Sequence, residues 1–238
     1  MSDSVEERID ETINLSIWMQ VDRTDSRFTK PVSFGRKFTS IDPTYQLKTA
    51  TALWGPYGDR WKMDNLSWRI IEPSFNEVQL EAYRDQMSNA ASTKDQDKIL
   101  RKMNPTLVLQ AELIYPGGRF PVMVDMPFEQ NDDCFKKLLT EARSKALSSL
   151  GFNADVFLGQ FDDNRYVAQS REHFAQEDER FQAGVKMIAA AETVEDLDRL
   201  KENVVKTIKI VDQRDELLQR IEDRQQRMEV AFSGGSDS

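Results

Sequence analysis

The stretch TLVLQAELIYPGGRFPVMVDMPF, residues 106–128, predicts a β-hairpin. Apolar and other side chains alternate along its first ten residues and again along its last ten, as they do in strands with one buried face. A proline and two glycines, residues 116–118, separate the two runs and form a turn signal. The two runs are therefore expected to be neighbouring antiparallel strands.

A helix is predicted directly after the hairpin, in NDDCFKKLLTEARSKALSSLG, residues 131–151. Asn131 or Asp132 is a suitable N-cap and Gly151 is a C-terminal stop. Apolar residues recur between them at helical spacing: Phe135, Leu138, Leu139, Ala142, Ala146 and Leu150. Cys134 lies inside this pattern, so we expect a small buried side chain rather than a nucleophile, in a reducing compartment.

The residues before the hairpin predict a helix and a third strand. Asp42-Pro43 is a helix start, with an N-cap oxygen followed by a proline in the first turn, and Gly55-Pro56 ends the pattern. A strand follows from about residue 60 to 71. Residues 74–104 are polar, contain helical pieces and are interpreted as an insertion. The order helix, strand, hairpin, helix predicts an α+β fold with an antiparallel sheet.

The two ends of the chain are expected to be largely helical. Residues 4–18 predict a short amphipathic helix, and 20–34 a loop with a short strand. Residues 152–167 are irregular but apolar, so we expect them to pack on the sheet. From residue 170 onward the chain is helical and rich in paired charges, and Thr193-x-x-Asp196 opens a further helix.

The net charge of −9 hides a basic segment. Residues 28–72 carry seven Lys and Arg against four Asp and Glu, a local balance of +3. Phosphates respond to the local field, so this distribution is compatible with a polyanionic partner. No run approaches the roughly 20 apolar residues of a membrane-spanning helix. The polar, acidic start of the chain is unlike a signal peptide and predicts a cytoplasmic protein.

The sequence contains few residue patterns that could support catalysis or bind a metal ion. One histidine and one cysteine cannot supply a structural zinc site or a Ser-His-Asp arrangement, and His173 lies in a polar run where a solvated side chain is expected. A magnesium-dependent nuclease is an alternative, with acidic candidates Glu112, Asp125, Asp155, Asp162 and Asp163. No Glu-x-Lys follows a strand, however, so we expect neither an enzyme nor a metal or other cofactor.

Two segments resemble a known family. SFGRKFTSIDPTYQLKTATALWGPYGDRW, residues 33–61, and LLTEARSKALSSLGFNADVFLGQFDDNRYV, residues 138–167, are similar to the phage single-strand annealing proteins of the Erf, Sak and Redβ superfamily, and through them to the eukaryotic annealase Rad-fifty-two. The resemblance covers roughly residues 30–167, and 74–104 match poorly. Its most specific parts are WGPYGDRW and SKALSSLGFNADVFLG.

The resemblance implies a β-β-β-α core that assembles into rings or helical filaments. It implies ATP-independent binding and annealing of single-stranded DNA in recombination, in the cytoplasm of a phage-infected bacterium. The chain accordingly lacks a GxxxxGK[ST] phosphate loop. Residues 1–167 would be the annealing core, with the helical region 168–232 regulating assembly or docking a single-strand-binding protein or an exonuclease, and 233–238 a flexible tail.

Single-strand binding combines a cationic groove with aromatic rings, which indicates the candidate residues. One side of the groove is expected to contain Arg36, Lys37, Lys48, Arg60 and Lys62, and the other Lys136, Arg143 and Lys145. Lys145 is the best match to a DNA-contacting cation of the family, whereas Ser148 stands where relatives often have a further basic residue. Tyr57 is expected to be an exposed ring, with Trp54 and Trp61 in the core.

A third hypothesis is a helical interaction scaffold, which rests on the charge-rich residues 170–232.

Overall fold

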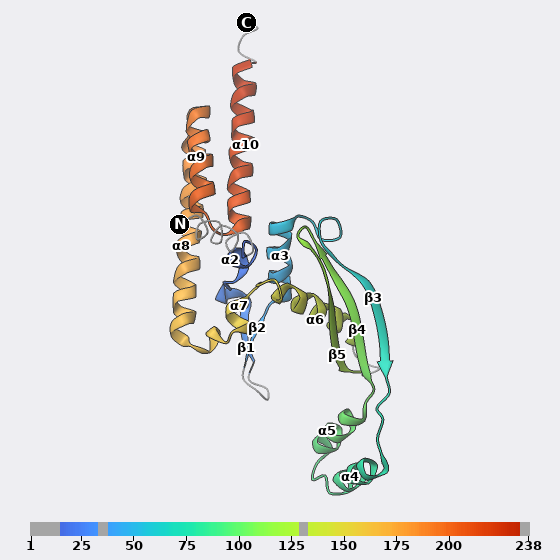
Figure 1. The fold of residues 1–238 in the computed structure, drawn as a ribbon. Helices are drawn as coiled ribbons and strands as arrows, with labels where there is room; N and C mark the ends of the chain where they lie inside the picture. Colours follow the sequence, from blue (N-terminus) through green and yellow to red (C-terminus); the bar gives the residue numbers. More distant parts are fainter. Residues whose placement is uncertain (1–14, 33–37, 129–132, 234–238) are drawn as a thin grey trace, which may run out of the picture. The chain divides into compact units, whose positions relative to one another are not determined.

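The computed structural model describes residues 15–32, 38–128 and 133–233. The chain divides into two compact units (Figure 1). Tyr57–Ala146 form a contiguous unit, the sheet unit, whereas Met1–Pro56 and Leu147–Ser238 together form the second, the helical unit. The α+β class predicted from the sequence is confirmed.

Three antiparallel strands form the sheet unit, in the order β3-β4-β5. They are β3 (Lys62–Ile71), β4 (Thr106–Tyr115) and β5 (Gly118–Pro127). The predicted hairpin is confirmed, and the pair Tyr115↔Gly118 closes it. The β3–β4 register shifts between Asp64 and Ser67, where Asn65 has a φ of 51°.

One face of the sheet is covered by α6 (Cys134–Ser148). The sheet contributes alternate buried side chains, namely Leu107, Leu109, Ala111, Leu113, Val122 and Val124. The helix contributes Cys134, Leu138, Ala142 and Ala146, so the expected burial of Cys134 is confirmed. The rings of Phe135 on α6 and Trp68 on β3 lie 5.1 Å apart. The expected caps of this helix, Asn131 and Asp132, lie outside the described residues.

The insertion between β3 and β4 is a pair of helices, α4 (Glu77–Ser88) and α5 (Thr93–Met103). Asn76 begins α4 with a capping box: its side chain accepts from the Gln79 N–H, and the Gln79 side chain accepts from the Asn76 N–H. Ser92 caps α5 through the Asp95 N–H. The helices follow the end of β3 and lead into β4 (Figure 1).

The helical unit begins with short elements: α2 (Trp18–Val21), η1 (Ser26–Phe28), β1 (Thr29–Val32) and β2 (Phe38–Ile41). The two strands pair antiparallel as a separate sheet. Helix α3 (Pro43–Trp54) confirms the predicted one: the Asp42 side chain accepts from the Thr44 N–H, and Gly55 ends the helix at a φ of 96°, which favours glycine. Most of the helix expected at 4–18 lies outside the described residues.

Residues 152–167, which we expected to pack on the sheet, belong to the helical unit. They form α7 (Ala154–Phe157), η2 (Gln160–Asp162) and the start of α8 (Asn164–Ala190). The Asn153 N–H donates to the Val21 carbonyl at 2.8 Å, and the Asp155 N–H donates to the Asp22 carbonyl at 3.1 Å. The segment therefore belongs with the N-terminal residues, because its backbone donors have their partners there.

The C-terminal region packs α8 with α9 (Val194–Thr207) and α10 (Val211–Ser233). Their shared core consists of Ile188, Ala191, Leu197, Val204, Ile208, Leu217 and Ile221. A Cβ atom on Gly184 of α8 would lie 2.9 Å from Leu217 Cδ1, so the glycine permits close packing of α8 on α10. None of the helices within the described residues is both long enough and apolar enough to span a membrane.

Helix α8 is continuous through residue 167, where we expected the functional boundary. The helices after this residue also group with Met1–Pro56. The proposed division of labour at 167 stays a prediction, but the structural units follow other borders. The expected tail lies almost entirely outside the described residues.

Candidate nucleic-acid interface

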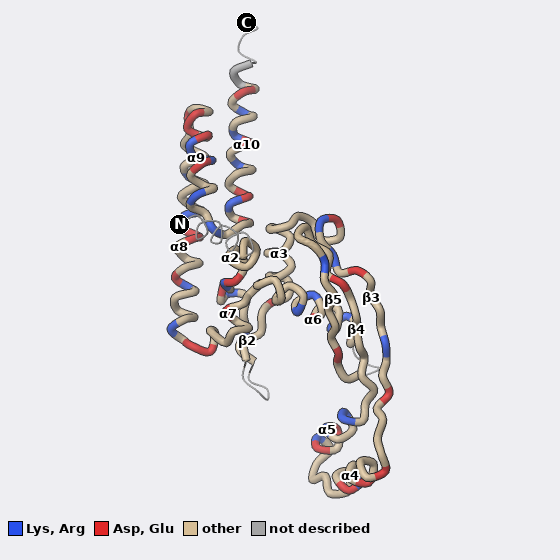
Figure 2. Tube along the Cα trace, viewed as in Figure 1, with Lys and Arg blue, Asp and Glu red and all other residues tan. Residues whose placement is uncertain are grey.

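Helix α6 is the most cationic element of the candidate interface. It contains Lys136, Lys137, Arg143 and Lys145 against a single acid, Glu141, whereas the sheet unit as a whole has 13 Lys and Arg against 14 Asp and Glu. The apolar stripe of α6 is buried, so these cations lie outside that stripe. Figure 2 shows the Lys and Arg positions of α6 in blue. A local positive field therefore exists on a nearly neutral unit.

The cations of α6 lie on both sides of its buried stripe. Lys136 and Arg143 are seven residues apart, two helical turns, and therefore share one side of the helix at a separation of about 10 Å. Lys145 lies on the other side, as expected, and its Nζ donates to the Met123 carbonyl at 3.2 Å. Sequence analysis overlooked Lys137, which adds a fourth charge to the same helix.

The Met123 carbonyl lies at the free edge of β5. The hairpin closes at Tyr115↔Gly118, and counting along the register places Pro121, Met123 and Pro127 where backbone groups point away from β4. Prolines at such positions remove no ladder hydrogen bond. Lys145 thus donates a hydrogen bond to a backbone carbonyl that points away from β4, and its own side chain stays exposed.

A second group of candidates lies at the turn before β3. The Gly58 N–H donates to the Trp61 carbonyl at 2.8 Å, which brings Tyr57 beside Trp61 with 4.8 Å between ring centroids. Trp61 is fully buried and Tyr57 is 42% exposed. The expected core positions of Trp61 and Trp54 are confirmed, as is the exposure of Tyr57.

Arg60 and Lys62 each lie beside a carboxylate. Arg60 Nε is 3.5 Å from Asp59 Oδ2, and Lys62 Nζ is 2.8 Å from Asp64 Oδ2. The hydrogen bond from Lys62 lowers the pKa of Asp64 below its usual value. Both cations are therefore partly neutralised by neighbouring carboxylates.

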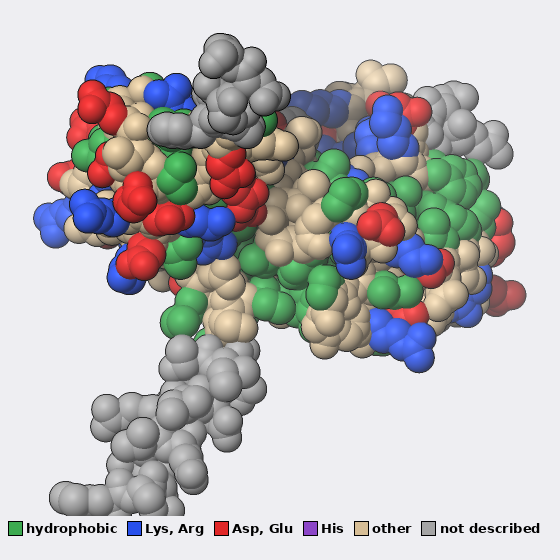
Figure 3. All heavy atoms as spheres, turned by 90° about the horizontal axis from the view of Figure 1, so that it is seen from above, with side chains coloured by type: hydrophobic (Ala, Val, Ile, Leu, Met, Phe, Trp, Pro, Cys, Tyr) green, Lys and Arg blue, Asp and Glu red, His purple; other side chains and the backbone are tan. Residues whose placement is uncertain are grey.

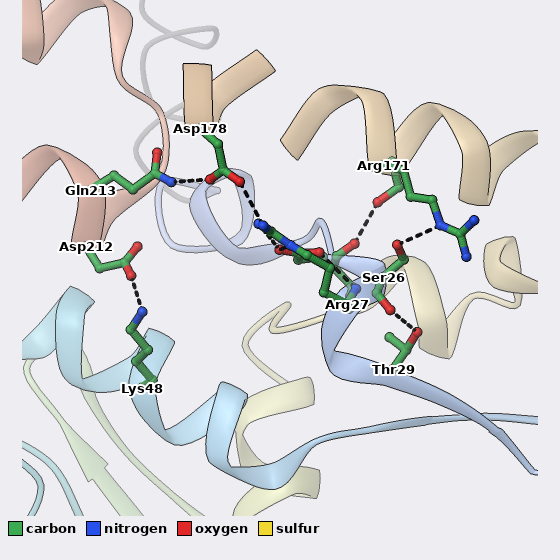
Figure 4. Close-up of polar contacts among 11 residues, drawn as sticks. Ser26, Arg27, Thr29, Lys48, Arg171, Asp178, Asp212 and Gln213 are labelled. Carbon is green, nitrogen blue, oxygen red and sulfur yellow. Dashed lines mark hydrogen bonds and ion pairs between the residues drawn. The ribbon is translucent and has the colours of Figure 1, made fainter. Parts of the chain in front are cut away.

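Lys48 belongs to the helical unit and pairs there with Asp212 of α10 at 2.6 Å (Figure 4). A parallel contact joins Arg27 to Asp178 of α8 at 2.8 Å, and the Gln213 side chain donates to the same carboxylate at 2.7 Å. The structure thus brings Lys48 together with acidic C-terminal helices. Arg36 and Lys37 lie outside the described residues.

A buried polar network, which the sequence did not reveal, fixes the N-terminal segment. The Asp155 carboxylate accepts from the Thr24 N–H at 2.8 Å, the Thr24 hydroxyl at 2.5 Å and the Tyr166 hydroxyl at 2.9 Å. Asn153 donates to the Thr24 hydroxyl, and Ser170 donates to the Thr24 carbonyl. Burial and the hydrogen bond to Asp155 raise the pKa of Tyr166.

The other carboxylates of the nuclease hypothesis have structural partners or ordinary strand positions. Glu112 accepts from the Asn65 side chain at 2.8 Å and lies 3.8 Å from Arg119, and Asp163 caps α8 through the Arg165 N–H. Asp125 lies opposite Val108 in the hairpin, and Asp162 ends η2. Within residues 15–32, 38–128 and 133–233, no three His, Cys, Asp or Glu side chains are grouped so as to hold a metal ion.

His173 is partly buried, whereas a solvated side chain was expected. Its ring lies 5.3 Å from Phe174 on α8, and burial lowers its pKa, with Arg23 adding to the effect. The side chain lines a cavity of about 1010 Å³ in the helical unit, together with Arg27, Lys48 and Asp178. The polar pattern around His173 was misleading because polar residues of the same run, Ser170 and Glu177, are themselves buried.

The chain was compared with protein-family models, with curated proteins and with solved structures, and it matches none of them.

Proposed function

We propose that this chain binds single-stranded DNA and anneals complementary strands without ATP, as a phage recombination protein that assembles into rings or filaments. The observation that carries the proposal is α6: four cations against one acid, on a helix whose other face packs on an antiparallel sheet. A rigid support of this kind holds the cations at fixed spacing, so they can contact successive phosphates. No catalytic step or cofactor is required.

Tyr57 supports a single strand as the ligand. An exposed ring supported from behind by buried Trp61 can stack on a base that is not paired. Stacking of this kind tolerates any sequence, which annealing requires because either complementary strand must bind.

The two edges of the sheet differ in a way that supports self-assembly. Prolines and the Lys145 contact protect the edge of β5, whereas β3 is a ten-residue terminal strand with exposed Leu66, Ile70 and Ile71. Long terminal strands with exposed apolar residues favour pairing with another chain. The β3 edge is therefore our candidate for a contact between copies.

Binding to a single strand, to the matching duplex and to the single strand with magnesium tests the proposal directly. We expect tight, salt-sensitive binding to the single strand, weaker binding to the duplex and no cleavage in any sample. Annealing of complementary oligonucleotides should accelerate without ATP. A protein that binds neither strand form, or that cleaves DNA with magnesium, would contradict the proposal.

The second candidate function is a helical scaffold. The observation that favours it is the independent core of α8, α9 and α10, whose surface in Figure 3 carries interspersed acidic and basic side chains. Such a mixed surface suits a protein partner, such as a single-strand-binding protein or an exonuclease, better than a polyanion. Removal of α9 and α10 tests this role. If the shortened protein still anneals DNA but no longer binds the partner, these helices serve as a docking site of an annealing protein.

A further inference from the structure

The α4–α5 insertion carries two charged stripes of opposite sign and equal length. Glu77, Glu81 and Asp85 lie four residues apart along α4, and Lys94, Lys98 and Lys102 lie four residues apart along α5. Residues four apart share one helix face, so each stripe is continuous over about 12 Å. Arg101 adjoins the basic stripe. Figure 2 shows red on α4, and both blue and red on α5, which also contains Asp95 and Asp97.

Both stripes are exposed and point away from the contact between the two helices. All six side chains are exposed, whereas the more buried positions are Leu80, Tyr83 and Met87 on α4 and Ile99 and Met103 on α5. Helical spacing puts these apolar positions on a different side from each stripe. The two stripes therefore do not face each other within one hairpin. Lys98 Nζ lies 3.4 Å from Asp95 Oδ1 on its own helix, an exposed ion pair that a contact with another chain would have to replace.

Helix dipoles explain only part of this charge distribution. An acid at the start of α4, Glu77, and bases at the end of α5, Arg101 and Lys102, are favourable. Asp85 in the last turn of α4 and Lys94 in the first turn of α5 are unfavourable for the same reason. The regular spacing thus includes residues that the isolated hairpin would disfavour.

We propose that the acidic stripe of α4 contacts the basic stripe of α5 in a second copy of this chain. The two stripes are opposite in sign and equal in spacing and length, so three ion pairs can form along one helix–helix contact. A polyanion fits less well, because Glu77–Met103 contains five acids and five bases and is neutral overall. The contact uses the segment that lies outside the annealing-protein resemblance, and it needs no nucleic acid.

Charge reversal of each stripe tests the contact on the full chain. One variant carries Lys94→Glu, Lys98→Glu and Lys102→Glu, so both its stripes are acidic. The other carries Glu77→Lys, Glu81→Lys and Asp85→Lys, so both are basic. Sedimentation velocity at low salt without DNA measures association, and circular dichroism checks the helix content of each variant.

We expect each variant alone to associate roughly 100-fold more weakly than wild type, because three exposed attractions become repulsions. A mixture of the two variants should associate again, and so should one chain that carries all six changes. The proposal is overturned by a monomeric wild-type protein, by unchanged association of the single-stripe variants, or by failure of the mixture to associate.

A nucleic-acid role for α5 is a separate outcome of the same experiment. If the Lys94→Glu, Lys98→Glu, Lys102→Glu protein loses single-strand binding while its self-association equals that of wild type, α5 binds DNA and the proposed contact is wrong. If wild type binds no DNA but the mixture of the two variants associates, the contact stands and only the proposed annealing function fails.

Discussion

Asp212, near the start of α10, forms an ion pair with Lys48 of α3, with 2.6 Å between Oδ2 and Nζ. Lys48 is one of the cations that the sequence assigns to phosphate binding. In the structure it is occupied by a carboxylate of the same chain, and a phosphate must compete with that carboxylate to bind there. If the chain binds DNA as we propose, Asp212 therefore opposes binding at this position.

Asp212→Asn should therefore increase single-strand affinity. Lys48 is exposed and Asp212 is half-buried, and pairs near the surface contribute about 0.2–1 kcal/mol, so release of Lys48 corresponds to a gain of up to about fivefold. Fluorescence anisotropy at low salt measures it. Glu216→Gln is the matched control, because Glu216 lies on the same helix but pairs with Arg220. Equal affinities for both variants would remove Lys48 from the interface.

Lys145→Ala and Arg143→Ala should each weaken DNA binding with little effect on folding. The logarithm of affinity falls with the logarithm of salt concentration, and each lost phosphate contact should flatten this slope by about 0.7. Stability should change by about 0.5 kcal/mol for Arg143 and at most about 1 kcal/mol for Lys145, which also bonds Met123. Lys201→Ala on α9 is the control. Wild-type salt slopes in both α6 variants would refute the α6 site.

Tyr57→Ala and Tyr57→Phe separate stacking from packing. Loss of a stacking ring should cost roughly 1–3 kcal/mol of single-strand binding without changing the salt slope. Tyr57→Phe keeps the ring and should bind normally. Thermal melting provides the structural readout, with Trp61→Ala as a fully buried reference that should cost about 3–5 kcal/mol of stability. A lower melting temperature with normal binding for Tyr57→Ala would assign that ring to packing alone.

Asp155→Ala should destabilise the fold because it leaves three donors from Thr24 and Tyr166 without their acceptor. We expect a loss of about 3 kcal/mol in the free energy of unfolding, measured by urea titration. Asp163→Ala, which removes only the cap of α8, should cost about 1 kcal/mol. Magnesium should not raise the melting temperature of wild type. A magnesium-dependent rise that Asp155→Ala abolishes would favour the metal-site alternative.

His173 should make stability depend on pH on the acidic side of neutrality. Its pKa is lowered in the folded chain from the ordinary 6.5 by burial, with Arg23 and Arg180 adding and Glu177 opposing. Below pH 6.5 the unfolded chain therefore binds a proton that the folded chain does not, and stability falls as pH falls. His173→Gln should make the urea midpoint of unfolding less dependent on pH across this window. Glu172→Gln, which removes a neighbouring carboxyl, is the control and should leave that slope in place.

The elements that the sequence predicted correctly are those whose signals are local. Asp42 and Gly55 fix the ends of α3 by hydrogen bonding and φ preference within a few residues. The alternation in β4 and β5 fixes their faces, and the turn between them fixes their register. The burial of Trp61 beside an exposed Tyr57 also follows from a turn within one short segment.

The failures concern partners that are distant in sequence. Nothing near Lys48 indicates that Asp212 will lie beside it, and nothing near Thr24 indicates Asp155. The apolar composition of residues 152–167 indicates that the segment is buried, but it does not indicate that the N-terminal residues are its partners. Helical spacing alone was enough to expect Lys136 and Arg143 outside the buried stripe of α6, whereas Lys137 on the same helix was overlooked.

The Thr24 network also sets the order in which the chain can fold during synthesis. Thr24 needs Asp155 and Ser170, which leave the ribosome more than a hundred residues later, whereas Tyr57–Ala146 are contiguous. At about 5–20 residues per second the N-terminal segment waits for roughly 7 to 30 s, while the sheet and α6 can already form. A nascent chain just long enough to expose residue 146 outside the ribosome should therefore present a folded sheet unit with the cations of α6 before α10, which carries Asp212, has been synthesised.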